Sequence, residues 1–343
     1  MPPPTRSGTI VQTCSQGSYE EVKHRACHAQ RKGNYMFKKT VIPHLCRLCH
    51  HEFSSVCFIK DSFTLVRCLS CGLVSVSNPP SKAEIERLYS FASGYHVGFC
   101  DDNSPEVRYY VNQARYYYSR LQKYKTEGRI LDIGCSAGLF LEVTREHGWD
   151  SYGIEISKDT AELARKRGGI KIVMGSLDQT RFRPKFFDVI TMWDVVEHVE
   201  DPTHMMTIVH SILKDDGIIA LSTPNIDGLF PKISYIISKF TKDWPHPEPP
   251  YHLFQFSKKT LQKLLHLARF EVLEVIDERS PIAYTFGSWN VMIRSPKRLL
   301  YSAMFLPTLL LGPSIHAGDS MLVFARKAHV RNTNHQNFCT PSN

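Results

Sequence analysis

The 343-residue sequence has no apolar stretch long enough to cross a lipid bilayer. Its strongest apolar run covers residues 299–312, and 14 residues are fewer than the roughly 20 that a spanning helix requires. Residues 1–35 are polar and lack the positively charged start and apolar core of a secretory signal. We therefore expect a cytoplasmic protein.

Cysteine is scarce for an exported scaffold, because ten cysteines are spread over 343 residues. The composition is otherwise that of a globular chain, with 42% hydrophobic and 22% charged residues, which excludes collagen, coiled coil and disorder throughout. The length predicts about two domains.

Acidic residues are outnumbered, and the net charge of +9 favours an acidic partner, either nucleic acid or an anionic membrane. The charge is uneven: residues 1–80 carry a net +6, residues 129–227 carry −5 and residues 228–343 carry +7. This distribution indicates separate modules and not one uniform basic surface.

From residue 129 onward, apolar strands alternate with helices. The expected strands are 129–133, 151–155, 170–174, 188–192, 217–222, 271–277 and 320–325. Alternation of this kind requires crossover connections, so it predicts an α/β fold with a mostly parallel sheet.

Two Cys-x-x-Cys pairs precede this region, Cys46 with Cys49 and Cys68 with Cys71. Two residues between cysteines let one tight turn direct both thiolates at one tetrahedral ion, so two such pairs predict a structural zinc ribbon. Cys46–Cys49 followed by His50 also fits c-type haem attachment, which would leave the second pair unexplained.

A glycine-containing loop follows the first expected strand and opens a helix. Gly134 and Gly138 allow a ligand to approach the backbone, and the helix N-terminus offers free N–H groups. Glu155, at the end of the second strand, is placed to accept ribose hydroxyls. Ser136 breaks the Gly-x-Gly-x-x-Gly pattern, and Asp132 would repel a pyrophosphate but could hold an ammonium group.

These segments resemble the motifs of class I S-adenosylmethionine-dependent methyltransferases. The similar segments are 131–135, 153–157, 187–190, 197–202 and 213–217. The resemblance implies a Rossmann-like, mostly parallel seven-stranded sheet with helices on both faces, preceded here by the small zinc ribbon. It also implies a set of residues that bind S-adenosyl-L-methionine: Asp132, Gly134, Cys135, Ser136, Gly138, Glu155, Ile156, Ser176, Leu177 and Trp193. Two positions depart from the family pattern: Ser136 stands where the family more often has glycine, and Ser176 stands where an acidic residue often follows the third strand.

Residues 251–257 and 268–272 are similar to the branch of ubiquinone-pathway O-methyltransferases. The cysteine module, with Asn78-Pro79-Pro80 after it, is similar to that of bacterial methyltransferases of sugar and polysaccharide pathways. We expect five parts: a disordered tail (1–40), the zinc ribbon (41–80), a helical linker or cap (81–128), the methyltransferase domain (129–328) and a second disordered tail (329–343). Substrate caps are expected near 228–256 and 281–318.

An oxygen nucleophile needs a base with a pKa near neutrality, which suits histidine. His198 follows the fourth strand, and His252 lies in the loop before a later helix; either is a candidate catalytic base, and capping or packing roles stay open for both. Trp193 and Asp194 end the fourth strand on the ligand side of the sheet. The sequence shows no second acidic residue arranged with Asp194 in a way that would indicate a catalytic magnesium ion.

The expected function is methyl transfer to a small-molecule, sugar or lipid-linked acceptor, at oxygen. The alternative is an RNA methyltransferase whose basic zinc-ribbon region docks nucleic acid, although residues 41–80 contain only three basic residues. Residues 299–312 are interpreted as a buried or lid segment, or as a peripheral contact with the inner membrane surface, aided by Arg294, Lys297 and Arg298. Pro307 predicts two short helical pieces there. The oligomeric state stays open.

Overall fold

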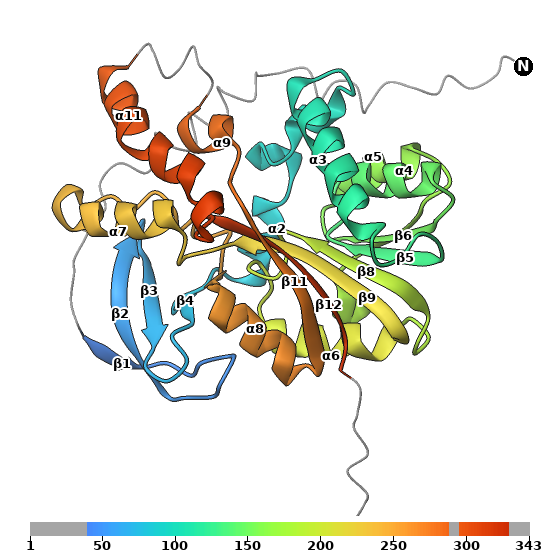
Figure 1. The fold of residues 1–343 in the computed structure, drawn as a ribbon, viewed down its shortest axis with the longest axis horizontal. Coiled ribbons are helices and arrows are strands. Elements are labelled where there is room, and N and C mark those ends of the chain that lie inside the picture. The colour runs from blue at the N-terminus through green and yellow to red at the C-terminus, as the bar shows by residue number, and fades with distance from the viewer. Residues whose placement is uncertain (1–39, 288–294, 329–343) are drawn as a thin grey trace, which may run out of the picture.

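The computed structural model describes residues 40–287 and 295–328 of the chain (Figure 1). The expected tail residues 1–39 and 329–343, and Arg294, lie outside the described residues. The described chain builds two sheets with helices around them.

The first sheet has five antiparallel strands in the order β1-β2-β3-β4-β10. They are β1 (Val41–Pro43), β2 (Phe53–Lys60), β3 (Phe63–Cys68), β4 (Val74–Val76) and β10 (Phe254–Gln255). The last strand comes from a much later part of the chain, since Phe254 pairs with Ser75 and Gln255 with Val74. The cysteine module is therefore joined by backbone hydrogen bonds to the segment that leads into a late helix, a link that the sequence did not predict.

The second sheet has seven strands in the order β11-β12-β9-β8-β5-β6-β7. They are β5 (Arg129–Ile133), β6 (Asp150–Glu155), β7 (Lys171–Met174), β8 (Phe187–Trp193), β9 (Leu213–Pro224), β11 (Phe270–Glu278) and β12 (Ser320–Lys327). Strands β5 to β9 run parallel, and only β12 pairs antiparallel with its neighbours. The expected seven-stranded, mostly parallel sheet is confirmed.

Helices cover both faces of this sheet because successive strand residues point to opposite sides. Ile130 and Val189 pack with residues of α3 and α4, whereas Leu131 and Ile190 pack with α6 and α8. Figure 1 shows α3, α4 and α5 on one side and α6 and α8 on the other. The helices are α2 (Lys82–Leu88), α3 (Pro105–Leu121), α4 (Leu139–Glu146), α5 (Lys158–Lys166), α6 (Pro202–Ile212), α7 (Leu229–Thr241), α8 (Lys258–Leu267), α9 (Ile282–Phe286) and α11 (Pro296–Leu311). Four 3-10 turns join them: η1 (Phe91–Ser93), η2 (Val97–Cys100), η3 (Leu177–Gln179) and η4 (Pro313–Ile315).

The prediction that Pro307 divides its segment into two short helices is wrong. Helix α11 runs without a break from Pro296 to Leu311 and contains Pro307. Proline removes one backbone donor and crowds the carbonyl four residues earlier, yet Phe305 and Leu309 are buried on either side of it. Burial of this apolar face offsets the local cost. No helix in the described part of the chain has the length and apolarity to cross a membrane.

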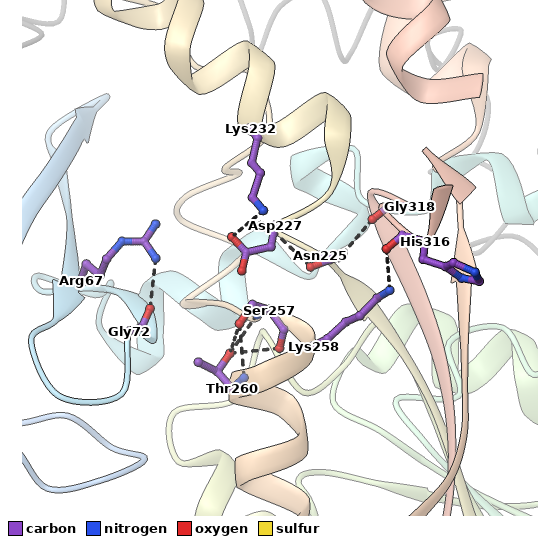
Figure 2. Close-up of polar contacts among 10 residues, drawn as sticks. All are labelled: Arg67, Gly72, Asn225, Asp227, Lys232, Ser257, Lys258, Thr260, His316 and Gly318. Carbon is purple, nitrogen blue, oxygen red and sulfur yellow. Dashed lines mark hydrogen bonds and ion pairs between the residues drawn. The ribbon is translucent and has the colours of Figure 1, made fainter. Parts of the chain in front are cut away.

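Helix α7 and the turn before β12 are fixed to each other by polar contacts that Figure 2 shows in part. The Asn225 side-chain amide donates to the Gly318 carbonyl oxygen at 2.8 Å, and the backbone N–H of Leu229 donates to Ala317 O at 2.8 Å. The Lys258 ammonium donates to His316 O at 2.8 Å. These bonds make the start of α7, the start of α8 and the end of the α11 segment one connected unit.

Candidate functional site

The four paired cysteines converge beside the first sheet. The Sγ atoms of Cys46 and Cys71 are 3.6 Å apart, those of Cys49 and Cys68 are 3.5 Å apart, and all four lie within 4.8 Å of one another. Four thiolates at about 2.3 Å from a tetrahedral zinc ion lie about 3.8 Å from each other. The cysteine set therefore fits a closed structural zinc site.

The loop from β5 to α4 reverses direction through left-handed backbone at Gly134, Ser136 and Gly138, with φ values of 73°, 48° and 76°. A Cβ atom on Gly134 would lie 2.7 Å from a methyl carbon of Val195, so only glycine fits there. Ser136 adopts a conformation that costs an L-residue about 1 kcal/mol. Its hydroxyl lies 2.7 Å from His96 Nδ1, a contact that holds this residue.

Glu155, at the end of β6, joins this loop to the next helix. Its Oε2 atom accepts from the backbone N–H of Ser136 and its Oε1 atom from that of Ser157, each at 2.7 Å. The side chain is only 5% exposed, and burial raises the pKa of its carboxyl. Each carboxylate oxygen keeps a second lone pair, which is the acceptor a ribose diol needs.

Asp132 and Cys135 both lie beneath the loop. Asp132 is 2% exposed and accepts from the Thr191 hydroxyl at 2.6 Å, and burial raises the pKa of its carboxyl to about 8. The Cys135 thiol points to Gly153, where an added Cβ would lie 2.5 Å from the sulfur. The structure therefore turns both side chains toward the interior.

The end of β7 lies beside Glu155, because the Gly175 N–H donates to Glu155 O at 2.8 Å. This bond brings Ser176 to the same edge, where its backbone N–H donates to Oε1 of Gln179 at 3.2 Å. Ile156 is 47% exposed and Leu177 is buried. The residues expected to surround a nucleoside thus gather at the carboxyl ends of β5, β6 and β7, where α/β sheets bind ligands.

Trp193, at the end of β8, packs against helices α3 and α4. Its ring stacks on Tyr117 with centroids 4.4 Å apart and meets the edge of Phe140 at 5.0 Å. Asp194 follows it with left-handed backbone (φ 51°), is exposed, and accepts from the Ser222 hydroxyl at 2.9 Å. Glu278 of β11, which the sequence did not single out, accepts from the Tyr117 hydroxyl at 3.4 Å.

His198 lies beyond β8 with a defined orientation of its ring. Its Nδ1 atom is 2.9 Å from Tyr251 O and 2.8 Å from the Tyr89 hydroxyl. A carbonyl oxygen only accepts, so this geometry places the proton on Nδ1 and leaves the lone pair on Nε2. Burial lowers the pKa of His198 to about 3, which keeps the ring neutral at pH values near 7.

The structure brings His252 to His198, as the two rings are 4.7 Å apart edge to face. The loop that carries His252 is held by backbone bonds from Leu253 and Phe254 to Glu197 O, at 2.8 and 3.0 Å. Burial lowers the pKa of His252 to about 4. The two candidate bases therefore form one pair, although they lie far apart in the sequence.

Glu197 completes this pair with a carboxyl group that the sequence did not reveal as functional. It is 1% exposed, and its Oε1 atom lies 4.0 Å from His198 Nε2. Among the described residues neither of its carboxyl oxygens has a hydrogen-bond partner, and the same holds for His252 Nδ1. Ligand atoms of Glu197, His198 and His252 lie within 4.8 Å of one another, so the three could hold a divalent cation or receive a proton from a bound molecule.

A short segment after α2 covers both halves of the site. Tyr95 stacks on His96 with centroids 3.8 Å apart and meets Tyr89 at 4.8 Å. His96 contacts Ser136 of the glycine loop, and Tyr89 contacts His198. Sequence reasoning missed these three residues because an isolated tyrosine or histidine in a loop has no periodic signal.

Comparison with known proteins identifies the domain. Residues 108–275 match the family model described as "Methyltransferase domain". The ubiquinone biosynthesis O-methyltransferase of Methylococcus capsulatus is 27% identical over 147 residues, which cover 41% of this chain and 62% of that protein. The protein of that name from Haemophilus ducreyi is 26% identical over 151 residues, covering 41% of this chain and 64% of that protein. The chain thus spans less than two thirds of the length of these relatives.

Solved structures of methyltransferases are similar at lower identity. An S-adenosylmethionine-dependent methyltransferase from Mesorhizobium loti is 19% identical with a TM-score of 0.44, over 62% of this chain and 98% of that one. One from Archaeoglobus fulgidus is 22% identical with a TM-score of 0.42, over 62% and 94% of the two chains. The family match confirms the resemblance seen in the sequence motifs.

Proposed function

The chain contains a methyltransferase domain, and from this premise we propose that it transfers a methyl group from S-adenosyl-L-methionine to a hydroxyl oxygen of a small molecule. The observation that carries the proposal is the placement of a neutral, oriented histidine, His198, which the contacts of Tyr89, Tyr95 and His96 connect to the glycine loop beside Glu155. The named relatives act in ubiquinone biosynthesis as O-methyltransferases, which supports oxygen as the attacked atom.

The cofactor-binding half consists of residues at the ends of three adjacent strands. We assign the ribose hydroxyls to the second lone pairs of Glu155, whose carboxylate is fixed by Ser136 and Ser157. The backbone around Gly134–Gly138 approaches the amino-acid part, and the backbone at Ser176 and Leu177 approaches the base. When bound, the sulfonium of the cofactor supplies an already activated methyl group, so the protein mainly positions the nucleophile.

The acceptor half lies around His198 and His252. A hydroxyl held near His198 Nε2 would give its proton to this lone pair as the oxygen attacks. Burial raises the pKa of the Glu197 carboxyl, and a positively charged imidazole 4.0 Å from its Oε1 atom would favour the ionised carboxylate, which in turn would stabilise the ring. His252 packs against the His198 ring and restricts the orientation of that ring. We therefore assign a positioning role to His252 and the role of base to His198.

The aromatic side chains near His198 favour a planar hydroxylated ring as the acceptor. Tyr89 and Tyr251 lie edge to face with centroids 6.1 Å apart, and Tyr95 and Tyr251 are nearly parallel at 6.5 Å. Aromatic faces beside a base suit a phenol, whose pKa near 10 makes its proton easier to remove than that of an alcohol. A sugar hydroxyl, with a much higher pKa, suits these surroundings less well.

The experiment is a comparison of acceptor classes with methyl-labelled S-adenosylmethionine and the purified full chain. Hydroxylated benzoates and quinol precursors should acquire label, and nucleotide sugars and mixed RNA should not. Tyr251→Leu should raise KM for the phenolic acceptor with little effect on cofactor binding. Label that appears in RNA or sugar alone would contradict the proposal.

A further inference from the structure

Helices α7 and α11, with the 3-10 turn η4 that follows α11, carry large apolar side chains that face outward. Phe240 is 85% exposed, Leu300 65%, Leu311 56% and Ile236 55%. Of the 17 large hydrophobic side chains exposed in the described chain, eight belong to these elements. We define the α7–α11 surface by these eight residues: Ile236, Phe240, Leu299, Leu300, Met304, Leu310, Leu311 and Ile315. A gathering of this kind marks an interaction site, whereas single exposed leucines do not.

The surface is rigid, because the opposite faces of both helices are already packed. Phe230 of α7 meets Phe305 of α11 edge to face at 5.5 Å, and Phe305 and Leu309 are buried. The backbone bond from Leu229 to Ala317 fixes the start of α7 to the end of the α11 segment, and so does the bond from Asn225 to Gly318 that Figure 2 shows. The outward residues therefore are not needed for this packing.

The charges of the two helices have one sign. Helix α7 contains Lys232 and Lys239, helix α11 contains Lys297 and Arg298, and neither helix contains an aspartate or glutamate. On α7, Lys232, Ile236, Lys239 and Phe240 are exposed at the i, i+4, i+7, i+8 spacing of one helical face. Cationic and apolar side chains are thus interleaved on the same face.

We propose that the α7–α11 surface docks on a membrane that carries anionic headgroups. Helices with this pattern lie in the plane of the interface, with apolar side chains at the acyl boundary and cations among the headgroups. A second copy of the same surface would place like charges opposite each other in a symmetric contact. Docking is independent of methyl transfer, so its test needs no substrate.

The test is flotation of the purified full chain with vesicles made of equal parts phosphatidylcholine and phosphatidylglycerol, beside vesicles of phosphatidylcholine alone. Wild type should float with the anionic vesicles at low salt and be released as salt rises. The double substitution Phe240→Ser with Leu300→Ser should weaken binding about tenfold or more, because it removes two outward apolar groups. Lys239→Glu with Lys297→Glu should weaken it comparably.

The matched control is Leu267→Ser, since Leu267 is 49% exposed on α8 and lies outside this surface. It should float like wild type, and near-ultraviolet circular dichroism should show that every variant is folded. Wild type that stays in solution with anionic vesicles would overturn the proposal, as would a double variant that floats unchanged. A concentration-dependent dimer, lost in Phe240→Ser with Leu300→Ser and without vesicle binding, would assign the surface to a second copy and would also overturn it.

Discussion

The carboxylate of Glu155 and the backbone N–H of Ser136 are joined by a hydrogen bond of 2.7 Å, which ties the end of β6 to the glycine loop after β5. Glu155→Gln keeps the shape of the side chain but replaces one acceptor oxygen by a donor and removes the charge. We expect binding of S-adenosylhomocysteine to weaken by about 1.5–3 kcal/mol, or tenfold or more. Isothermal titration calorimetry measures the change.

Glu146→Gln is the control for that substitution, because Glu146 is exposed at the end of α4. Its affinity for S-adenosylhomocysteine should equal that of wild type. An unchanged affinity in folded Glu155→Gln protein would show that the ribose does not bind to this carboxylate.

The two histidines of the acceptor half should differ in kinetic effect. His198→Gln removes the lone pair on Nε2, and we expect kcat to fall about 10²–10⁴-fold with cofactor affinity retained. His252→Gln should change kcat less, since that ring only positions its neighbour. Equal losses in both variants would contradict the separate roles.

The pH dependence of catalysis follows from the low pKa of the base. Burial lowers the pKa of His198 to about 3, so its protonation should not limit kcat/KM between about pH 5 and pH 8. A rising acid limb with a midpoint near 6.5, lost in His198→Gln, would show that this ring is solvated and not buried as described.

Asp132 should make the folded state less stable as the pH rises. Burial raises the pKa of its carboxyl from 3.8 to about 8, so the protonated form is favoured by folding. That stabilisation is fully present below the unfolded pKa and is lost as pH rises through the folded pKa. Asp132→Asn should flatten the decline of the melting temperature from about pH 5 to about pH 8. Parallel melting curves for variant and wild type over this range would refute the raised pKa.

Zinc removal should affect more than the cysteine module. Cys46 and Cys71 belong to the same buried cluster as Leu131 and Ile190 of the large sheet, and β4 pairs with β10. Cys68→Ser should lower zinc from one ion per chain to none and destabilise the whole fold. Metal analysis by inductively coupled plasma mass spectrometry checks this. A divalent ion retained in folded Cys68→Ser protein would place a metal ion at Glu197, His198 and His252. Covalently bound haem in the wild-type protein would contradict the zinc site.

The order of strands and helices after residue 129 was predictable because burial on both faces leaves apolar runs at regular intervals. The cofactor loop was predictable for a similar local reason, since Gly134 and Gly138 meet steric demands of a single turn. The pairing of β4 with β10 was not, because a two-residue strand has no periodicity. Glu197 also escaped prediction, because its closeness to His252 depends on how a distant loop folds back. For Pro307, tertiary burial outweighed the local preference.

The most direct test of methyl transfer to oxygen is a carbon NMR spectrum of the reaction mixture, with S-adenosylmethionine carrying a ¹³C-labelled methyl group and a phenolic acceptor. Wild-type protein should convert the sulfonium methyl signal into an aryl methyl ether signal, and His198→Gln should do so far more slowly. A labelled methyl found on nitrogen or carbon, or a sulfonium signal that wild type leaves unchanged although calorimetry shows the cofactor bound, would contradict the account.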